Sequence, residues 1–338
     1  MTVADALHAA VAELAASSGL GEVVGLARLP GGGNNRAYRA ETATGSVFVK
    51  EYFRDPADAR DRLGAEVSFS TFAWAMGVRS IPEPLASDPD RGIALFAFVD
   101  GHAPAASEVG ERHVDEAVAF LAQLNSRREA PGAAQLPPAS EACFSIERHL
   151  ALVGRRVDRL VAEAGEPARG FVRERLVDAW AQLVRRVRHR ATRHGLDVRE
   201  ELSPARRCLS PSDFGFHNVL VGAGSRLIFH DFEYAGWDDP AKLAGDFRCQ
   251  PAVPVPSALV ARFDDGLART LELSSAERAR AEVLGPVFRV KWCCIFLNDF
   301  LPDGRRHRSF TGTEADRDVH EQLDKASRVL DGMAEGHD

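Results

Sequence analysis

The sequence predicts an α+β fold of two lobes, in which a small five-stranded antiparallel sheet with a helix precedes a larger, mainly helical part. Five short apolar segments bounded by turn residues lie before residue 101. After that point the apolar residues recur at helical spacing, interrupted by a single hairpin. The composition changes near residues 101–104. We therefore predict an N-terminal lobe over residues 1–101 and a C-terminal lobe over residues 102–338.

The composition is typical of a soluble globular protein. The chain has 338 residues, of which 45% are hydrophobic and 27% charged. Its net charge of −7 argues against nucleic acid as a partner, and no apolar run approaches the roughly 20 residues that cross a membrane. Five cysteines without a C-x-x-C pair indicate reduced thiols in a cytoplasmic protein rather than a zinc site. The oligomeric state stays open.

The N-terminal lobe is predicted element by element. Residues 1–19 have the pattern of an amphipathic helix rather than of a signal peptide. Three strands follow, the first two joined by the glycine-rich turn GGGNN, and then come a helix and two strands around the turn DPD. The predicted strands are 22–30, 36–42, 46–53, 81–87 and 91–100, and the predicted helix spans 56–76 with Leu63, Val67, Ser70 and Trp74 on one face.

The C-terminal lobe is predicted to be helical apart from a loop and a hairpin. Residues 126–141 form a loop rich in proline and alanine, and residues 219–230 form the hairpin. The arginines of the 169–194 segment alternate with apolar residues at helical spacing, which predicts a solvated outer face rather than a nucleic-acid interface. The predicted helices are 111–125, 144–164, 169–194, 240–248, 256–272, 275–299 and 315–333.

One stretch, LSPSDFGFHNVLVGAGSRLIFHDFEYAGWDDP, carries a pattern of catalytic residue types. Asp213 precedes Asn218 by five positions on a loop, and the hairpin that follows delivers Asp231 alongside them. Phosphoryl transfer from a nucleotide needs such a set, because one carboxylate orients the acceptor hydroxyl while an amide oxygen and a second carboxylate hold Mg²⁺. The alternative is that these residues serve turns and helix caps, as Asp and Asn in loops often do.

Upstream residues complete the pattern. The glycine-rich turn contains Gly32, Gly33 and Asn34, whose backbone N–H groups can approach nucleotide phosphates because glycine has no Cβ. Lys50 ends an apolar strand and is one of only four lysines, at 50, 242, 291 and 325. Such a lysine can pair with the α- and β-phosphates, and Glu66 on the next helix can hold it. The alternative is a hairpin turn and a surface ion pair.

Together these residues resemble the aminoglycoside phosphotransferase and choline kinase-like family, whose fold is similar to that of the protein kinases. The resemblance covers about residues 25–300. The family's H-G-D-x-x-x-x-N motif corresponds to residues 211–218, and its D-F-G equivalent corresponds to Asp231-Phe232-Glu233. The resemblance implies ATP or GTP as phosphate donor, Mg²⁺ as cofactor and a small-molecule hydroxyl, on a sugar, nucleoside or antibiotic-like alcohol, as acceptor.

The resemblance also assigns roles to individual residues. Asp213 would be the catalytic base, and Asn218 and Asp231 would hold Mg²⁺. Lys50 would bind the phosphates and Glu66 would position it. The adenine would lie against the stretch FAFVDG, with Phe96 behind it and the backbone of Ala97 and Val99 at its edge.

Two positions depart from the family motif. Pro211 stands where the family has histidine and Ser212 where it has glycine, which puts the geometry of the loop in question more than its chemistry. The alternatives to a small-molecule kinase are a nucleotide-binding pseudokinase, a protein-modifying kinase and a nucleotidyltransferase.

Further residues carry weaker predictions. We expect His217 to make a structural or loop contact, Asp239 to cap a helix that begins at Pro240, and Cys293 and Cys294 to lie in the core. The segment FRVKWCCIFLNDFLPDGRRHRSF is a candidate wall of the acceptor pocket. Its cations, Lys291 among them, outnumber its two aspartates, which favours a neutral or anionic acceptor over a polycation.

Overall fold

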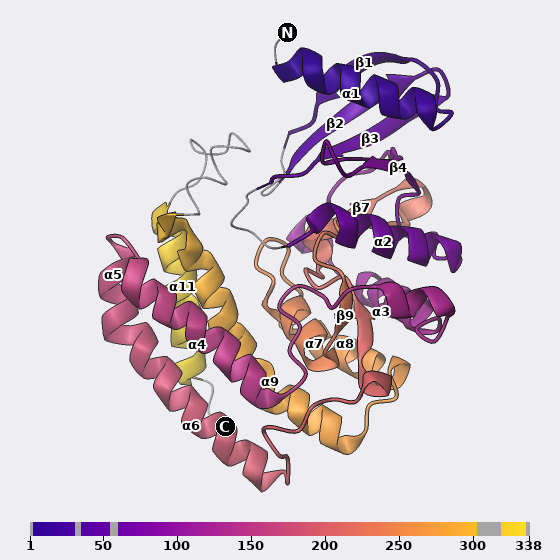
Figure 1. The fold of residues 1–338 in the computed structure, drawn as a ribbon. Coiled ribbons are helices and arrows are strands. Elements are labelled where there is room, and N and C mark those ends of the chain that lie inside the picture. Colours follow the sequence, from indigo (N-terminus) through magenta and orange to yellow (C-terminus); the bar gives the residue numbers. More distant parts are fainter. Residues whose placement is uncertain (1–2, 31–34, 55–59, 303–318, 336–338) are drawn as a thin grey trace.

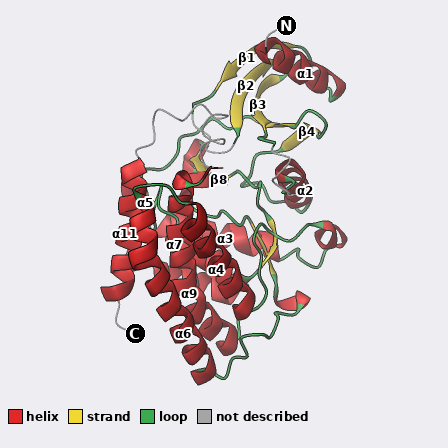
Figure 2. Cartoon of the chain, turned by 60° about the vertical axis from the view of Figure 1, so that its left-hand side comes forward, coloured by secondary structure: helices red, strands yellow, loops and turns green. Residues whose placement is uncertain are grey.

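A computed structural model describes residues 3–30, 35–54, 60–302 and 319–335 and confirms the predicted fold class. The sheet and the first helix, α1, form one end of the molecule, and a larger group of helices forms the other (Figure 1). The strands of the N-terminal sheet lie at one end, and helices dominate the rest, when the molecule is turned (Figure 2). Within the described parts of the chain, every helix is too short or too polar to cross a membrane.

The N-terminal sheet has five antiparallel strands in the order β1-β2-β3-β5-β4. Each predicted strand is present, although the structure trims its ends. The strands are β1 Val23–Arg28, β2 Arg36–Thr42, β3 Gly45–Glu51, β4 Pro84–Asp88 and β5 Ile93–Ala97.

Helices cover both faces of this sheet. Helix α1 (Val3–Ser17) packs on one face through Val11 and Ala15, against a cluster that includes Val49 of β3. Side chains alternate between the faces along a strand, so Lys50 lies on the opposite face, which α2 covers. This alternation brings the lysine to the helix that carries Glu66.

Helix α2 spans Arg62–Ala75 and begins later than the predicted start at residue 56. Asp61 is the N-cap, and its side chain accepts a hydrogen bond from the N–H of Gly64 at 2.8 Å. A cap of this kind satisfies an N–H group that has no partner within the helix, so the helix begins after Asp61. The positions that indicated the helix, from Leu63 to Trp74, all lie after the cap, so they did not determine where the helix begins.

The larger lobe contains two apolar clusters. The first includes α3, α7, α8 and the central hairpin, together with one face of α2. The second joins α4, α6, α9 and α11, and Cys293 and Cys294 lie within it as predicted. The helices are α3 Glu111–Asn125, α4 Ile146–Glu163, α5 Ala168–Phe171, α6 Val177–Arg193, α7 Pro240–Cys249, α8 Ser257–Thr270, α9 Ser275–Phe296 and α11 Val319–Glu335; a π-helical turn, η3 Val172–Leu176, joins α5 to α6.

Four short strands support the predicted catalytic stretch. The expected hairpin is present as β7 (Val219–Val221) and β8 (Leu227–Phe229). A second pair, β6 (Cys208–Ser210) with β9 (Gly236–Asp238), was not predicted. Three residues are too few to show a strand alternation in sequence. This pair lies on either side of the loop that carries Asp213.

Candidate active site

Aromatic residues anchor the loop that carries Asp213 and Asn218. Phe214 and Phe216 are buried among the aromatic side chains of α3, α7 and α8. Phe214, for example, stacks at 5.3 Å from Phe247, measured between ring centroids. Because the apolar side chains point into the core, Asp213 remains partly exposed, with 34% of its side-chain surface accessible. The loop therefore presents a carboxylate on a rigid support.

A hydrogen bond joins two of the three motif residues, and the hairpin brings the third to the same end. The side-chain N–H₂ group of Asn218 donates to the backbone carbonyl of Asp213 at 3.0 Å. Asn218 directly precedes β7 and Asp231 is the second residue after β8, so both lie at the open end of one hairpin. The backbone N–H of His230 closes that end by donating to the carbonyl of Asn218 at 3.0 Å.

Lys50 lies at the centre of three carboxylates. Its Nζ atom is 2.5 Å from Oε2 of Glu66 and 3.9 Å from Oε2 of Glu233, and it also makes a close ion pair with Asp231. Burial alone would lower the pKa of Lys50, but the surrounding carboxylates outweigh that effect and raise it above its ordinary value. The ammonium therefore stays charged.

Asp231 is the carboxylate of this group that reaches the surface. Its side chain is 35% exposed, whereas those of Lys50 and Glu66 are nearly inaccessible. Burial would raise the pKa of Asp231, but the charge of Lys50 lowers it below the ordinary value. An ionised, accessible carboxylate is suited to bind a cation.

Glu66 links the two lobes. Its Oε1 atom accepts a hydrogen bond from the backbone N–H of Phe232 at 3.2 Å, and its Oε2 atom accepts one from the hydroxyl of Tyr52 at 2.7 Å. Phe232 in turn packs against Phe69 of α2 with ring centroids 5.1 Å apart. Glu66 therefore positions Lys50 and the segment after Asp231 at once. The role of Tyr52 had not been predicted.

Glu233 and Asn35 form a second contact between the lobes that the sequence analysis missed. Glu233 is only 2% exposed and accepts a hydrogen bond from the side-chain N–H₂ of Asn35. The amide oxygen of Asn35 accepts from the backbone N–H of Phe53 at 3.1 Å, and the guanidinium of Arg62 lies 3.9 Å from Glu233. The available signal was the position of Glu233, two residues after Asp231.

His217 contacts the predicted base directly. Its Nε2 atom lies 3.3 Å from Oδ1 of Asp213. The expected loop contact is therefore present, and its partner is the carboxylate itself. His230, which precedes Asp231, is also close to this group; burial lowers the pKa of His230 to about 4, which leaves its ring neutral near pH 7.

The remaining predicted nucleotide contacts are only partly described. Gly32, Gly33 and Asn34 lie outside the described residues. Phe96 is 4% exposed and lies on the α2 face of the sheet. The N–H of Ala97 donates to the carbonyl of Glu83 at 2.8 Å, so it is committed within the protein. Val99 lies two residues beyond the end of β5.

The donor set at the hairpin fits a magnesium ion. The hydrogen bond from the Asn218 N–H₂ group fixes that amide so that its oxygen, a hard ligand, faces away from the Asp213 carbonyl. No three His, Cys, Asp or Glu side chains of the described chain gather as a metal site. That result is compatible with magnesium, which protein sites commonly bind through one or two carboxylates together with substrate phosphates.

The structure corrects one residue of the predicted acceptor wall. Lys291 is not a free cation of the wall, because it is 5% exposed and its Nζ lies 2.6 Å from Oδ1 of Asp246. Arg305, Arg306, His307 and Arg308 lie outside the described residues, as does Asp303.

Asp239 caps α7 as predicted, by accepting from the N–H of Ala241 at 2.9 Å.

The fold and this geometry define the class of protein: a two-lobed chain with the fold of the protein kinases and an Asp–Asn–Asp set beside a buried Lys–Glu pair. The sequence profile of the phosphotransferase enzyme family matches residues 25–283. The chain therefore belongs to the phosphotransferase enzyme family, which confirms the resemblance inferred from the motifs. No curated protein matches the chain.

Solved structures of small-molecule kinases share the fold at low identity. One is a spectinomycin phosphotransferase in complex with ADP and spectinomycin, at 12% identity and a TM-score of 0.65, covering 97% of this chain and 96% of that one. Another is the choline kinase LicA from Streptococcus pneumoniae, at 13% identity and a TM-score of 0.61, covering 96% and 99%. A third is the APH(2")-IIa complex with streptomycin and ATP, at 14% identity and a TM-score of 0.57, covering 98% and 97%.

Proposed function

We propose that the protein is a magnesium-dependent kinase that transfers the γ-phosphate of ATP to a hydroxyl group of a small molecule. The observation that carries this proposal is the convergence of Lys50, Glu66 and Asp231 across the lobes, at 2.5 Å for the Lys50–Glu66 pair. Asp231 shares the open end of its hairpin with Asn218, whose amide bonds to Asp213. Such a set is suited to hold a nucleotide at one side and an acceptor at the other.

Each residue has a defined task in this proposal. Lys50 binds phosphate oxygens, and Glu66 keeps its ammonium in place. Asp213 orients the acceptor hydroxyl and takes its proton. Asn218 and Asp231 would hold magnesium, which neutralises charge on the phosphates when it is bound. The protein contributes mostly by positioning groups and stabilising charge, since phosphoryl transfer needs little covalent chemistry from it.

The nucleotide is proposed to lie between a lobe of residues 1–101 and a lobe of residues 102–338. Phe96 and the Val99 backbone would border the adenine, and Gly32, Gly33 and Asn34 would approach the phosphates. Structures of this fold that hold ADP, or ATP with streptomycin, support ATP over GTP. The free thiols of all five cysteines suit a cytoplasmic location, which we include in the proposal.

The acceptor class is proposed at the level of a hydroxylated small molecule: a sugar, a nucleoside or an antibiotic-like alcohol. The fold is shared with enzymes named for spectinomycin and choline. The charge of the wall segment had favoured a neutral or anionic acceptor. Lys291 no longer contributes to that argument, because its charge is paired with Asp246. We therefore keep both charged and neutral alcohols in the proposal.

A screen of ATP consumption tests the proposed function. Purified protein is incubated with ATP and MgCl₂ and with neutral sugars, nucleosides, choline-like alcohols or aminoglycosides in separate reactions. We expect one class to stimulate ATP consumption and to yield a phosphorylated product by mass spectrometry. ATP binding without turnover in any reaction would favour the pseudokinase alternative, and release of pyrophosphate together with an adenylylated acceptor would favour a nucleotidyltransferase.

Variants of the two proposed metal ligands give a second prediction. Asp231→Ala removes a charged ligand and Asn218→Ala a neutral one, so both are expected to raise the magnesium concentration needed for half-maximal activity, and Asp231→Ala more so. Magnesium titrations at fixed ATP check this order. Asp88→Ala, on β4 of the N-terminal sheet, serves as the control. A wild-type magnesium dependence in both site variants would remove these residues from the metal site.

A further inference from the structure

Ser212, the residue before Asp213, has an unusual backbone. Its φ angle is +68°, in the left-handed region that residues with a Cβ rarely adopt. Ser212 is also 5% exposed. A strained, buried conformation persists only where the surrounding structure holds it, and the adjacent residue is the proposed base. What holds Ser212 therefore also determines where the carboxylate of Asp213 points.

Lys242 provides that support from α7. Its Nζ atom donates to the hydroxyl oxygen of Ser212 at 2.7 Å. The Ser212 hydroxyl in turn donates to the carbonyl of Ser140 at 3.4 Å, and the Ser212 N–H donates to the hydroxyl of Ser210 at 2.9 Å. Pro211 has no side-chain donor or N–H group that could serve instead. The hydroxyl and the N–H of Ser212 are thus both fixed.

The ammonium of Lys242 is fully used. Besides Ser212, it contacts Oδ2 of Asp238 at 2.8 Å and Oδ2 of Asp246 at 3.2 Å. A lysine ammonium has three N–H donors, and here each has an acceptor. Lys242 is 1% exposed, so the planar guanidinium of arginine, with five donors, would leave donors without acceptors at this position.

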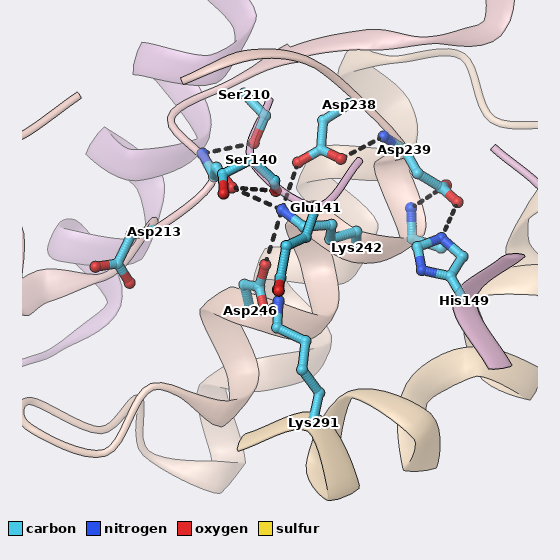
Figure 3. A network of polar contacts seen from close by, with 12 residues as sticks. Ser140, Glu141, His149, Ser210, Asp213, Asp238, Asp239, Lys242, Asp246 and Lys291 are labelled. Carbon is cyan, nitrogen blue, oxygen red and sulfur yellow. Dashed lines mark hydrogen bonds and ion pairs between the residues drawn. The ribbon is translucent and has the colours of Figure 1, made fainter. Parts of the chain in front are cut away.

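The contact between Lys242 and Ser212 is part of a larger network of buried charged residues (Figure 3). Asp246 also pairs with Lys291 of α9 at 2.6 Å. Two lysines and two aspartates, from β9, α7 and α9, thus alternate in charge behind the catalytic loop. Buried ion pairs of this kind add little stability compared with apolar packing, because removing charges from water is costly. Their consequence here is a fixed direction for the Ser212 hydroxyl.

We propose that Lys242 is a positioning residue for phosphoryl transfer, which acts by holding Ser212 and thereby aiming the carboxylate of Asp213 at the acceptor. This inference rests on the proposed function, because it assumes that Asp213 is the base. It extends the active site to a lysine that contacts neither the nucleotide nor the acceptor. The contact with Ser212 makes the proposal testable without removing a buried charge.

The test compares Ser212→Ala and Ser212→Gly with the wild type. Alanine removes the hydroxyl and keeps the unfavourable backbone, whereas glycine removes the hydroxyl and accepts a φ of +68° without strain. We expect kcat to fall about 10- to 100-fold in both variants, with the KM for ATP changed less than about threefold, because a small misplacement of a catalytic group affects the chemical step. Ser212→Gly leaves one buried Lys242 donor without its acceptor, so its Tm should fall modestly, by no more than that of Ser145→Ala.

Ser145→Ala is the matched control. Ser145 is also a buried serine, 3% exposed, and its hydroxyl caps α4 by accepting from the N–H of Arg148 at 3.2 Å. Its loss should lower Tm and leave kcat unchanged. If Ser212→Gly keeps the wild-type kcat, or if Ser145→Ala lowers kcat as much as the Ser212 variants do, Lys242 has no positioning role.

Amide hydrogen exchange separates this inference from the proposed function. Both Ser212 variants should exchange faster than the wild type in peptides covering residues 208–221, and Ser145→Ala should not. If exchange in these peptides is unchanged in the Ser212 variants, the contact between Lys242 and Ser212 does not hold the loop, even if the enzyme is active. Faster exchange in the Ser212 variants, together with a wild-type protein that consumes no ATP, would support the contact between Lys242 and Ser212 and reject the kinase function.

A double-mutant cycle assigns the effect to Lys242. Lys242→Met removes the donor and, if it folds, should lower kcat by as much as Ser212→Ala does, while the double variant should be no slower than Lys242→Met alone. Fully additive effects on kcat would show that the two residues act separately. If Lys242→Met does not fold, the result with Ser212→Gly decides.

Discussion

Asp213→Asn is expected to lower turnover by about 10²- to 10⁴-fold, the range that loss of a general base produces. Asparagine has nearly the same shape and can still accept a hydrogen bond, but it cannot take a proton from the acceptor hydroxyl. The loop should keep its conformation, because Phe214 and Phe216 remain buried and Asn218 still bonds to the backbone carbonyl of residue 213. Steady-state kinetics with ATP and the acceptor found by screening give the measurement.

Two measurements make this prediction specific. ATP affinity, measured by calorimetry, should stay within about threefold of the wild type, since Asp213 contacts the acceptor and not the nucleotide in this mechanism. Asp197→Asn, on an exposed loop where the carboxylate accepts a hydrogen bond from the N–H of Arg199 at 2.9 Å, is the control and should be fully active. An Asp213→Asn variant with more than half of the wild-type activity would exclude Asp213 as the base.

The order of elements and the motif residues could be predicted because both depend on local sequence. Alternation along β3 places Lys50 on the face of the sheet opposite to that of Val49, and helical spacing places Glu66 on α2. The contact between Lys50 and Asp231 joins residues 181 positions apart. No periodicity predicts such a contact, and the resemblance to the kinase motifs gave Lys50 and Asp231 separate roles without pairing them. The start of α2 was wrong because a single cap residue determined it.

The buried polar networks could not be predicted from spacing, yet the rarity of lysine was a usable signal. Only four of the 42 basic residues are lysines, and three of these, Lys50, Lys242 and Lys291, are buried and ion-paired. A compact ammonium with three donors suits a closed site, whereas arginine presents a wide planar group. In a chain that otherwise uses arginine, the lysines mark such sites. Only Lys50 was predicted to lie in such a site, whereas Lys291 was assigned to the acceptor wall.

Asp239 is expected to be the residue whose loss costs the most stability. It is fully buried, and Arg280 of α9 donates to Oδ1 at 2.7 Å and to Oδ2 at 2.5 Å. His149 of α4 lies 2.8 Å from Oδ2, and the N–H of Ala241 donates to Oδ1 at 2.9 Å. One carboxylate thus joins three helices. Asp239→Ala leaves the buried guanidinium without its partner, so we expect it to lower the free energy of unfolding by about 3–5 kcal/mol.

The pH dependence of this contribution follows from the charge of Asp239. Burial would raise the pKa of Asp239, but Arg280 and His149 outweigh it and lower the pKa to about 2. An unfolded aspartate titrates near 3.9, so the folded state favours the ionised form. The resulting stabilisation, roughly 2–3 kcal/mol, is nearly complete above about pH 4.5 and is lost as the pH falls from there through the folded value.

Urea unfolding of the wild type and of Asp239→Asn, from pH 8 down to the lowest pH at which both fold reversibly, checks this prediction. Asparagine keeps the shape and has no charge, so the difference in unfolding free energy between the two proteins reports the carboxylate. We expect that difference to be constant above about pH 4.5, because Asp239 is ionised in both folded and unfolded states there. Asp115, which pairs with Arg262 at 2.6 Å on the surface, is the matched control, and Asp115→Asn should change stability far less, since solvent screens exposed pairs. A difference that declined between pH 7 and pH 5, or an Asp115→Asn variant as unstable as Asp239→Asn, would show that burial with Arg280 does not set the strength of this contact.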